Sequence, residues 1–220
     1  MLGRIRPLIA AAILGALPGQ ARPCDTALLL AIDVSNSIDV GEYRIQSEGL
    51  AEALLDPLVM EALVTGQVAL TVVQWSGAGK QQVSLPWARM MDDADVALFA
   101  EAARTMRRAF VLSDTAVGDI IAFGRQHFAA VPDCARKVID ISGDGDDNAG
   151  TVPEVERLRA EREGITINAL AIESLGLSIT NYYRLKVITR NGFVMTAKGH
   201  STYAETLKRK IRREVAKVMF

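Results

Sequence analysis

Short apolar runs alternate along the chain with longer segments in which apolar residues recur every three or four positions. The run at 26–33 (TALLLAID) is almost continuously apolar and ends in an acid, which is typical of a parallel strand buried on both faces. The segment 41–55 has instead the spacing of a helix with one apolar face. The whole pattern predicts strands at 26–33, 67–75, 82–87, 137–142, 165–172 and 193–197, and helices at 41–55, 95–108, 116–129, 152–163, 182–189 and 203–219.

Strands that alternate with helices need crossover connections, and these give a mostly parallel sheet with helices on both faces. Pro86 cannot donate a ladder hydrogen bond, so the short strand at 82–87 belongs at a sheet edge. We therefore predict one α/β domain over 22–220 with a doubly wound, Rossmann-like sheet of six strands, mostly parallel with one short antiparallel edge strand. Ligands of such sheets bind beyond the carboxyl ends of the strands.

The first 21 residues have the pattern of an export signal. Arg4 and Arg6 precede an uncharged apolar core at 8–17, and Gly19 and Ala21 place small residues before a cut after Ala21. A membrane-spanning helix needs about 20 apolar residues, which this core does not have. We expect a signal peptide at 1–21, a periplasmic or secreted mature chain, and no stable insertion in the membrane.

Charge excludes one class of partner. Without residues 1–21, which contain two Arg and no acid, 23 Lys and Arg face 26 Asp and Glu, a net charge of −3. Because phosphate binding needs a basic surface, we expect no nucleic-acid partner. The predicted last helix nevertheless carries a crowd of cations, which we interpret as a solvated face near a helix C-terminus. These cations are Lys208, Arg209, Lys210, Arg212, Arg213 and Lys217.

Oxygen-bearing side chains follow two of the predicted strands. Asp33, Ser35 and Ser37 come directly after the first strand, Asp144 follows the fourth, and Thr115 opens the helix at 116–129. Hard oxygen donors of this kind suit Mg²⁺ or Mn²⁺, and Ca²⁺ less well. Two carboxylates and neutral hydroxyls leave such a cation short of negative charge, so it would take an anionic oxygen from outside.

These three motifs resemble the metal-ion-dependent adhesion site of von Willebrand factor A domains: Asp-x-Ser-x-Ser, then Thr-x-x-Gly, then Asp-Gly. The resemblance implies hydroxyl ligands from Ser35, Ser37 and Thr115, and a cation held directly or through water by Asp33 and Asp144. It also implies that the first and fourth strands are neighbours, and that a protein partner offers an Asp or Glu carboxylate. The stretches DVSNSID, QWSG and ISGDGDDN are similar to those of an uncharacterised group of exported bacterial A-domain proteins.

The fourth-strand motif departs from the family pattern. Most A domains have Thr before the Asp-Gly pair, whereas Gly143 stands here, and Asp146, Asp147 and Asn148 follow. These extra polar residues make the rim of the site more negative than usual. They could recruit a second cation or discourage an acidic partner, and the sequence leaves both interpretations open.

Cys24 lies nine residues before Asp33, and Cys134 lies ten before Asp144. If the two strands are parallel neighbours, as the resemblance implies, both cysteines fall at the end of the sheet opposite the metal, within bridging distance. We predict a Cys24–Cys134 disulfide, formed in an oxidising compartment. Two buried free thiols are the alternative.

We interpret the chain as an exported binding module and expect no catalysis. The main alternative is a metal-dependent phosphohydrolase of the haloacid dehalogenase type, because the 143–148 stretch is similar to that family's last acidic motif. That mechanism needs a general acid two residues after the nucleophilic Asp, where Ser35 stands. The sequence has no Gly-x-Ser-x-Gly motif, so it does not indicate a serine hydrolase. We expect His127 and His200 to be surface or satisfied histidines.

Overall fold

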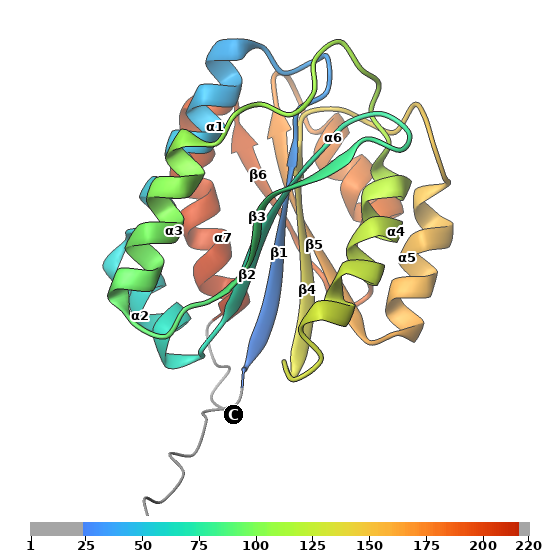
Figure 1. Ribbon diagram of the computed structural model, residues 1–220. Helices are drawn as coiled ribbons and strands as arrows, with labels where there is room; N and C mark the ends of the chain where they lie inside the picture. Colours follow the sequence, from blue (N-terminus) through green and yellow to red (C-terminus); the bar gives the residue numbers. More distant parts are fainter. Residues whose placement is uncertain (1–23, 216–220) are drawn as a thin grey trace, which may run out of the picture.

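The six strands form one sheet in the order β3-β2-β1-β4-β5-β6 in the computed structural model, which describes residues 24–215 (Figure 1). Every neighbouring pair is parallel except β2 and β3, so the predicted doubly wound sheet with one antiparallel edge strand is confirmed. The strands are β1 (Thr26–Asp33), β2 (Ala69–Trp75), β3 (Gln81–Arg89), β4 (Arg136–Gly143), β5 (Ile165–Glu173) and β6 (Val194–Lys198).

Helices cover both faces of the sheet (Figure 1). One layer holds α1 (Val40–Leu54), α2 (Pro57–Thr65), α3 (Asp93–Thr105) and α7 (Tyr203–Val215). The other holds α4 (Val117–His127), α5 (Pro153–Arg162) and α6 (Ser178–Tyr182), with the π-helical turn η2 (Tyr183–Val187) after α6; short 3₁₀ turns lie at Phe128–Ala130 and His200–Thr202.

Strand β1 is buried on both faces and separates two apolar cores. Leu28, Leu30 and Ile32 face the core under α1, α3 and α7, while Leu29 and neighbouring alanines face the core under α4. The alternation follows from the two-residue period of a strand, which sends successive side chains to opposite faces. The nearly continuous apolar run in the sequence is therefore explained by a central position in the sheet.

Two helical segments differ from the sequence pattern. Residues 57–65, for which no element is predicted, form α2: the Asp56 carboxylate accepts hydrogen bonds from the backbone N–H groups of Leu58 and Val59, and Pro57 occupies the first helical position. Proline suits that position because its missing N–H would have no partner there. The helix predicted at 182–189 begins earlier, at Ser178, and changes to a π-helical turn at Tyr183.

The prediction that the cations of the last helix form a solvated face is wrong at Lys210. This side chain is 0 % exposed, and its ammonium forms ion pairs with Asp140 of β4 and, at 2.5 Å, with Glu214. Asn168 Nδ2 donates to Oε1 of Glu214 at 2.8 Å. Burial, with the nearby Asp140 charge, raises the pKa of Glu214 to about 8. A buried cation persists only when it is paired in this way.

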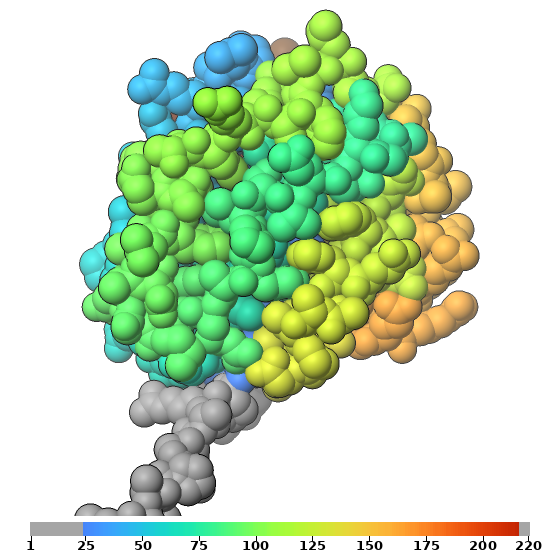
Figure 2. Space-filling model, viewed as in Figure 1, coloured from blue at the N-terminus to red at the C-terminus, as the bar shows by residue number. Residues whose placement is uncertain are grey.

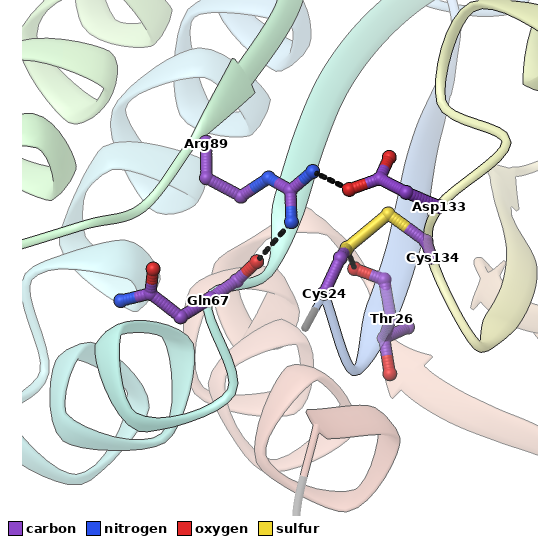
Figure 3. The surroundings of a disulfide bond; sticks show 6 residues. All are labelled: Cys24, Thr26, Gln67, Arg89, Asp133 and Cys134. Atoms are coloured by element: carbon purple, nitrogen blue, oxygen red, sulfur yellow. Dashed lines mark hydrogen bonds and ion pairs between the residues drawn. A yellow bond between two sulfur atoms is a disulfide. The ribbon is translucent and has the colours of Figure 1, made fainter. Parts of the chain in front are cut away.

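The predicted Cys24–Cys134 disulfide is confirmed, and it joins the chain just before β1 to the chain just before β4 (Figure 3). The two Cα atoms are 4.4 Å apart, and the backbone N–H of Ala135 donates to the carbonyl of Cys24. Beside the bridge, Arg89 pairs with Asp133 at 2.6 Å. The bridge therefore fastens the two central strands at the end opposite their carboxyl ends.

The export signal expected at 1–21 lies outside the residues that the structure describes. Within residues 24–215, no helix is both long and apolar enough to cross a membrane.

Removing the disulfide should destabilise the domain by roughly 2–5 kcal/mol, because the bridge closes a loop of more than a hundred residues in the unfolded chain. The Cys24→Ala/Cys134→Ala variant tests this by urea unfolding, with wild-type protein in reductant as the matched comparison. Two reactive thiols in denatured, unreduced wild-type protein would contradict the bridge itself.

Candidate metal centre

Four of the predicted ligands meet at the carboxyl ends of β1 and β4. Oδ1 of Asp33 accepts a hydrogen bond from the backbone N–H of Ser35 at 2.7 Å, and the hydroxyls of Ser35 and Ser37 are 3.1 Å apart. The Ser37 hydroxyl in turn donates to Oδ1 of Asp144 at 2.6 Å. The parallel register, in which Ile32 pairs with Ser142, brings these two segments together. Residues 107 positions apart thus share one cluster of oxygens.

Thr115 lies against the loop that carries Asp144. Its side chain is buried, and its hydroxyl lies 3.7 Å from the position that a Cβ would occupy on Gly145. Its backbone N–H donates to Oδ1 of Asn148, and its carbonyl accepts from the N–H groups of Asn148 and Ala149. The fifth predicted residue is therefore fixed beside the site by the β4–α5 loop.

Arg108 supports the Asp33–Ser37 loop from the other side. Its guanidinium donates to the carbonyls of Val34 at 3.0 Å and of Ser35 at 2.9 Å. The sequence pattern assigns Arg108 to the end of a helix, but α3 ends at Thr105 and Arg108 lies in the α3–α4 loop. No local motif marks this role, since its partners are more than seventy positions away.

Buried polar residues at the end of β2 hold the same α3–α4 loop. Gln74 accepts from the N–H of Ala109 and donates to the carbonyl of Arg107, both at 2.8 Å, and the Ser76 hydroxyl donates to the carbonyl of Asp114. Both side chains belong to the QWSG stretch, so this stretch is the sequence signal that points to the loop. Its structural role is to anchor the backbone that leads to Thr115.

The polar residues after Asp144 bind backbone groups. Oδ1 of Asp147 accepts from the N–H groups of Val117 at 2.7 Å and Gly118 at 3.4 Å, at the start of α4. Asn148 holds Thr115, as described above, while Asp146 is exposed. Among residues 24–215, no group of three or more His, Cys, Asp or Glu side chains is arranged to hold a metal. Asp147 and Asn148 thus brace the loop at the rim of the site.

The site has an electrostatic deficit that a cation would relieve. Asp33 is 0 % exposed and its Oδ2 has no hydrogen-bond partner. Burial raises the pKa of Asp33 to about 7, against the opposing effect of the Ser35 hydrogen bonds. Burial also raises the pKa of Asp144, which a hydrogen bond from Ser37 and the nearby His200 oppose. A buried carboxylate oxygen without a donor fits a divalent cation or a water bound to one.

Gly143 leaves space for a tyrosine. A Cβ on Gly143 would lie 2.5 Å from the hydroxyl oxygen of Tyr183 and 2.9 Å from Oδ2 of Asp33. Side chains do not approach a Cβ so closely, so the Thr that most A domains have at this place would force the Tyr183 and Asp33 side chains to shift. The departure from the family pattern is therefore explained by the Tyr183 side chain.

The two histidines have ring or charge partners. Nδ1 of His200 is 3.1 Å from Oε1 of Glu42, and its side chain is 11 % exposed. His127 stacks against Trp87 and Phe123. The Nε2 atom of each ring is buried and has no hydrogen-bond partner among residues 24–215, so the expectation of surface or satisfied histidines is wrong for this atom. The sequence pattern also does not predict that His200 lies near Asp144.

Comparisons with known proteins agree with this fold. Residues 23–219 match the family described as "Protein of unknown function (DUF1194)". No curated protein matches the chain.

Among solved structures, the chain is similar to proximal thread matrix protein 1 from the mussel byssus, in a form with a zinc-occupied metal-ion-dependent adhesion motif (21 % identity, TM-score 0.66, covering 87 % of this chain and 48 % of that one). It is also similar to a von Willebrand factor type A protein from Catenulispora acidiphila (21 %, TM-score 0.60, 89 % and 43 %). A third match is the von Willebrand factor domain of the type V pili tip protein Mfa5 from Porphyromonas gingivalis (11 %, TM-score 0.59, 91 % and 99 %).

The chain spans about half the length of the first two of these proteins. At such identities the likeness concerns the fold, and the von Willebrand factor A fold implied by the sequence motifs is confirmed.

Replacing Asp33 with Asn should stabilise the cation-free domain near and above neutral pH. The Asn keeps an acceptor for the Ser35 N–H and removes a buried charge. Because the folded pKa of about 7 exceeds the ordinary 3.8, the wild type loses stability as pH rises between these values. The gain should be near zero at about pH 4 and reach on the order of 2–4 kcal/mol above about pH 7.

Urea unfolding in chelator across this pH range measures the gain. Asp93→Asn, an exposed acid at the start of α3, is the control. The same pH dependence in wild type and Asp33→Asn would show that another group is responsible.

Asp147→Ala should cost about 1 kcal/mol of unfolding free energy, since it removes the acceptor at the N-terminus of α4. Asp147→Asn keeps an acceptor oxygen and should cost clearly less. Unfolding of both variants in chelator makes the comparison. Equal losses would mean that the negative charge matters, and not the acceptor.

Proposed function

Since the chain belongs to the DUF1194 family of proteins of unknown function and has a von Willebrand factor A fold, we propose that it is an exported binding module that engages a protein partner through a divalent cation. The observation that carries this proposal is the oxygen cluster at the carboxyl ends of β1 and β4. There, Asp33, Ser35, Ser37 and Asp144 lie within one connected set of contacts, and Oδ2 of Asp33 has no partner.

The chemistry of the donors favours Mg²⁺ or Mn²⁺ over Ca²⁺. All the candidate ligands are hard oxygens, and hydroxyls outnumber carboxylates. Ca²⁺ sites use six to eight oxygens, often from bidentate carboxylates, whereas Mg²⁺ is satisfied by one or two carboxylates and retained waters. The zinc-occupied motif of the mussel protein supports a divalent cation at this place in the fold.

The small number of charged ligands favours a carboxylate from outside. Asp33 and Asp144 are the acids of the cluster, and the other candidate ligands are neutral hydroxyls, which bind a divalent cation less strongly than carboxylates do. A partner's Asp or Glu would complete its coordination with a charged oxygen, which binds more strongly than a neutral one.

The surface around the site suits a protein partner. Aliphatic side chains are exposed at this edge, on the first residue of α1 and on two loops: Val40 at 79 %, Leu112 at 85 % and Leu175 at 88 %. The α3–α4 loop and the start of α1 project at the top of the molecule (Figure 2). Exposed apolar groups beside a polar centre are a common feature of protein-binding surfaces.

Two observations support an exported setting and a role without catalysis. The Cys24–Cys134 disulfide is of the kind that persists in oxidising compartments, which agrees with the expected signal peptide and a periplasmic or secreted location. The phosphohydrolase alternative would need an acid where Ser35 lies, and Ser35 is 0 % exposed with its hydroxyl close to Ser37. We therefore propose no enzymatic activity.

Mg²⁺ or Mn²⁺ should raise the melting temperature of the wild type, and Asp33→Ala and Ser35→Ala should abolish the rise. At a hundred times the Kd the metal contributes about 2.7 kcal/mol, which corresponds to roughly 5–10 °C for a domain of this size. Differential scanning calorimetry with chelator as reference measures this shift. Asp93→Ala, at the opposite end of the sheet, is the matched control and should respond like wild type.

No metal-dependent shift in wild type would contradict the cation site. If the site binds metal, capture of a partner from a periplasmic extract should require the metal and be lost with Asp33→Ala. Hydrolysis of a generic phosphate ester that Ser35→Ala abolishes would favour the phosphohydrolase instead.

A further inference from the structure

Tyr183 is a buried tyrosine whose hydroxyl lacks a hydrogen-bond partner. The side chain is 0 % exposed and lies in the apolar core under α4 and α5. A buried hydroxyl without a partner is unfavourable, so phenylalanine would pack here better unless the oxygen is used.

The hydroxyl oxygen lies near the carboxylate of Asp33. The position of a Cβ on Gly143 lies 2.5 Å from the Tyr183 oxygen and 2.9 Å from Oδ2 of Asp33. Because both oxygens are so close to this one position, the distance between them is no greater than that between two groups joined by a bridging water. Both atoms are buried and both lack a partner. One is a donor and the other is an acceptor, so their requirements match.

The surrounding structure fixes Tyr183 in this place. Glu173, at the end of β5, accepts from the N–H of Thr180 at 2.6 Å and so holds α6 against the sheet. The N–H of Ile188 then donates to the carbonyl of Tyr183 at 3.0 Å, which is the five-residue bond of a π-helical turn. Such turns are rare and are frequently found at functional sites.

We propose that Tyr183 is a positioning residue of the cation site: when the cation is bound, its hydroxyl donates to Oδ2 of Asp33, directly or through one bound water. The hydrogen bond holds the carboxylate in the orientation in which it meets the cation. Glycine at position 143 leaves this space open, because a Cβ there would crowd both oxygens. This inference rests on the proposed function, since it concerns the same site.

Tyr183→Phe, which removes a single oxygen, should weaken Mn²⁺ binding about five- to tenfold in isothermal titration calorimetry, as expected for one hydrogen bond. Its melting temperature in chelator should equal or exceed that of wild type, because the unpartnered hydroxyl is gone. Tyr203→Phe is the matched control: this tyrosine is also buried, but it packs in the other core, and its variant should bind Mn²⁺ like wild type.

The outcomes separate this inference from the proposed function. Equal Mn²⁺ affinity in wild type and Tyr183→Phe would overturn the inference and leave the cation site in place. No Mn²⁺ binding by wild type would overturn both. Weaker binding together with a lower melting temperature in chelator would mean that the hydroxyl supports the fold, and would also overturn the inference.

A double-mutant cycle in chelator tests the placement without any metal. Gly143→Ala should lower the urea midpoint of wild type, because its Cβ collides with the Tyr183 oxygen. In the Tyr183→Phe background the same change should lower the midpoint less. Equal losses in the two backgrounds would show that a side chain at position 143 does not meet the Tyr183 oxygen. The placement on which the proposed hydrogen bond depends would then be overturned.

Discussion

The parallel pairing of β1 with β4 is the constraint on which the other features depend. Its register places Asp33 beside Gly143 and Asp144 at one end of the two strands, and Cys24 beside Cys134 at the other. Because β1 is buried on both faces, a shift of one residue would exchange its two apolar sets between the cores. The apolar packing therefore fixes the geometry of the polar site.

The site itself is built from loops that hold one another. Gln74 anchors the loop that leads to Thr115, Arg108 joins that loop to the Asp33 loop, and Asn148 joins it to the β4–α5 loop. Each of these contacts satisfies backbone groups that would otherwise have no partner near a buried site. Polar groups without direct contact to a cation thus determine where the candidate ligands lie.

The sequence predicted the sheet and the five candidate ligands because each depends on a local pattern. The pattern of an apolar strand followed by Asp33, Ser35 and Ser37 can be recognised within a dozen residues of sequence. The partners of Arg108 and Tyr183 are distant in sequence, so nothing in their neighbourhood marks them. The solvated position predicted for Lys210 is wrong for the same reason. Its charge is compensated by Asp140 on another element, and a count of local charges cannot show this.

The ion pairs beneath α7 have a consequence for how such a sequence evolves. Lys210 lies between Asp140 of β4 and Glu214, all within the core. Loss of the cation alone would leave two buried carboxylates without compensation, and loss of either acid would alter the balance around a buried ammonium. Related sequences should therefore keep all three positions charged or replace them together with apolar residues, so that substitutions in β4 and in the last helix covary.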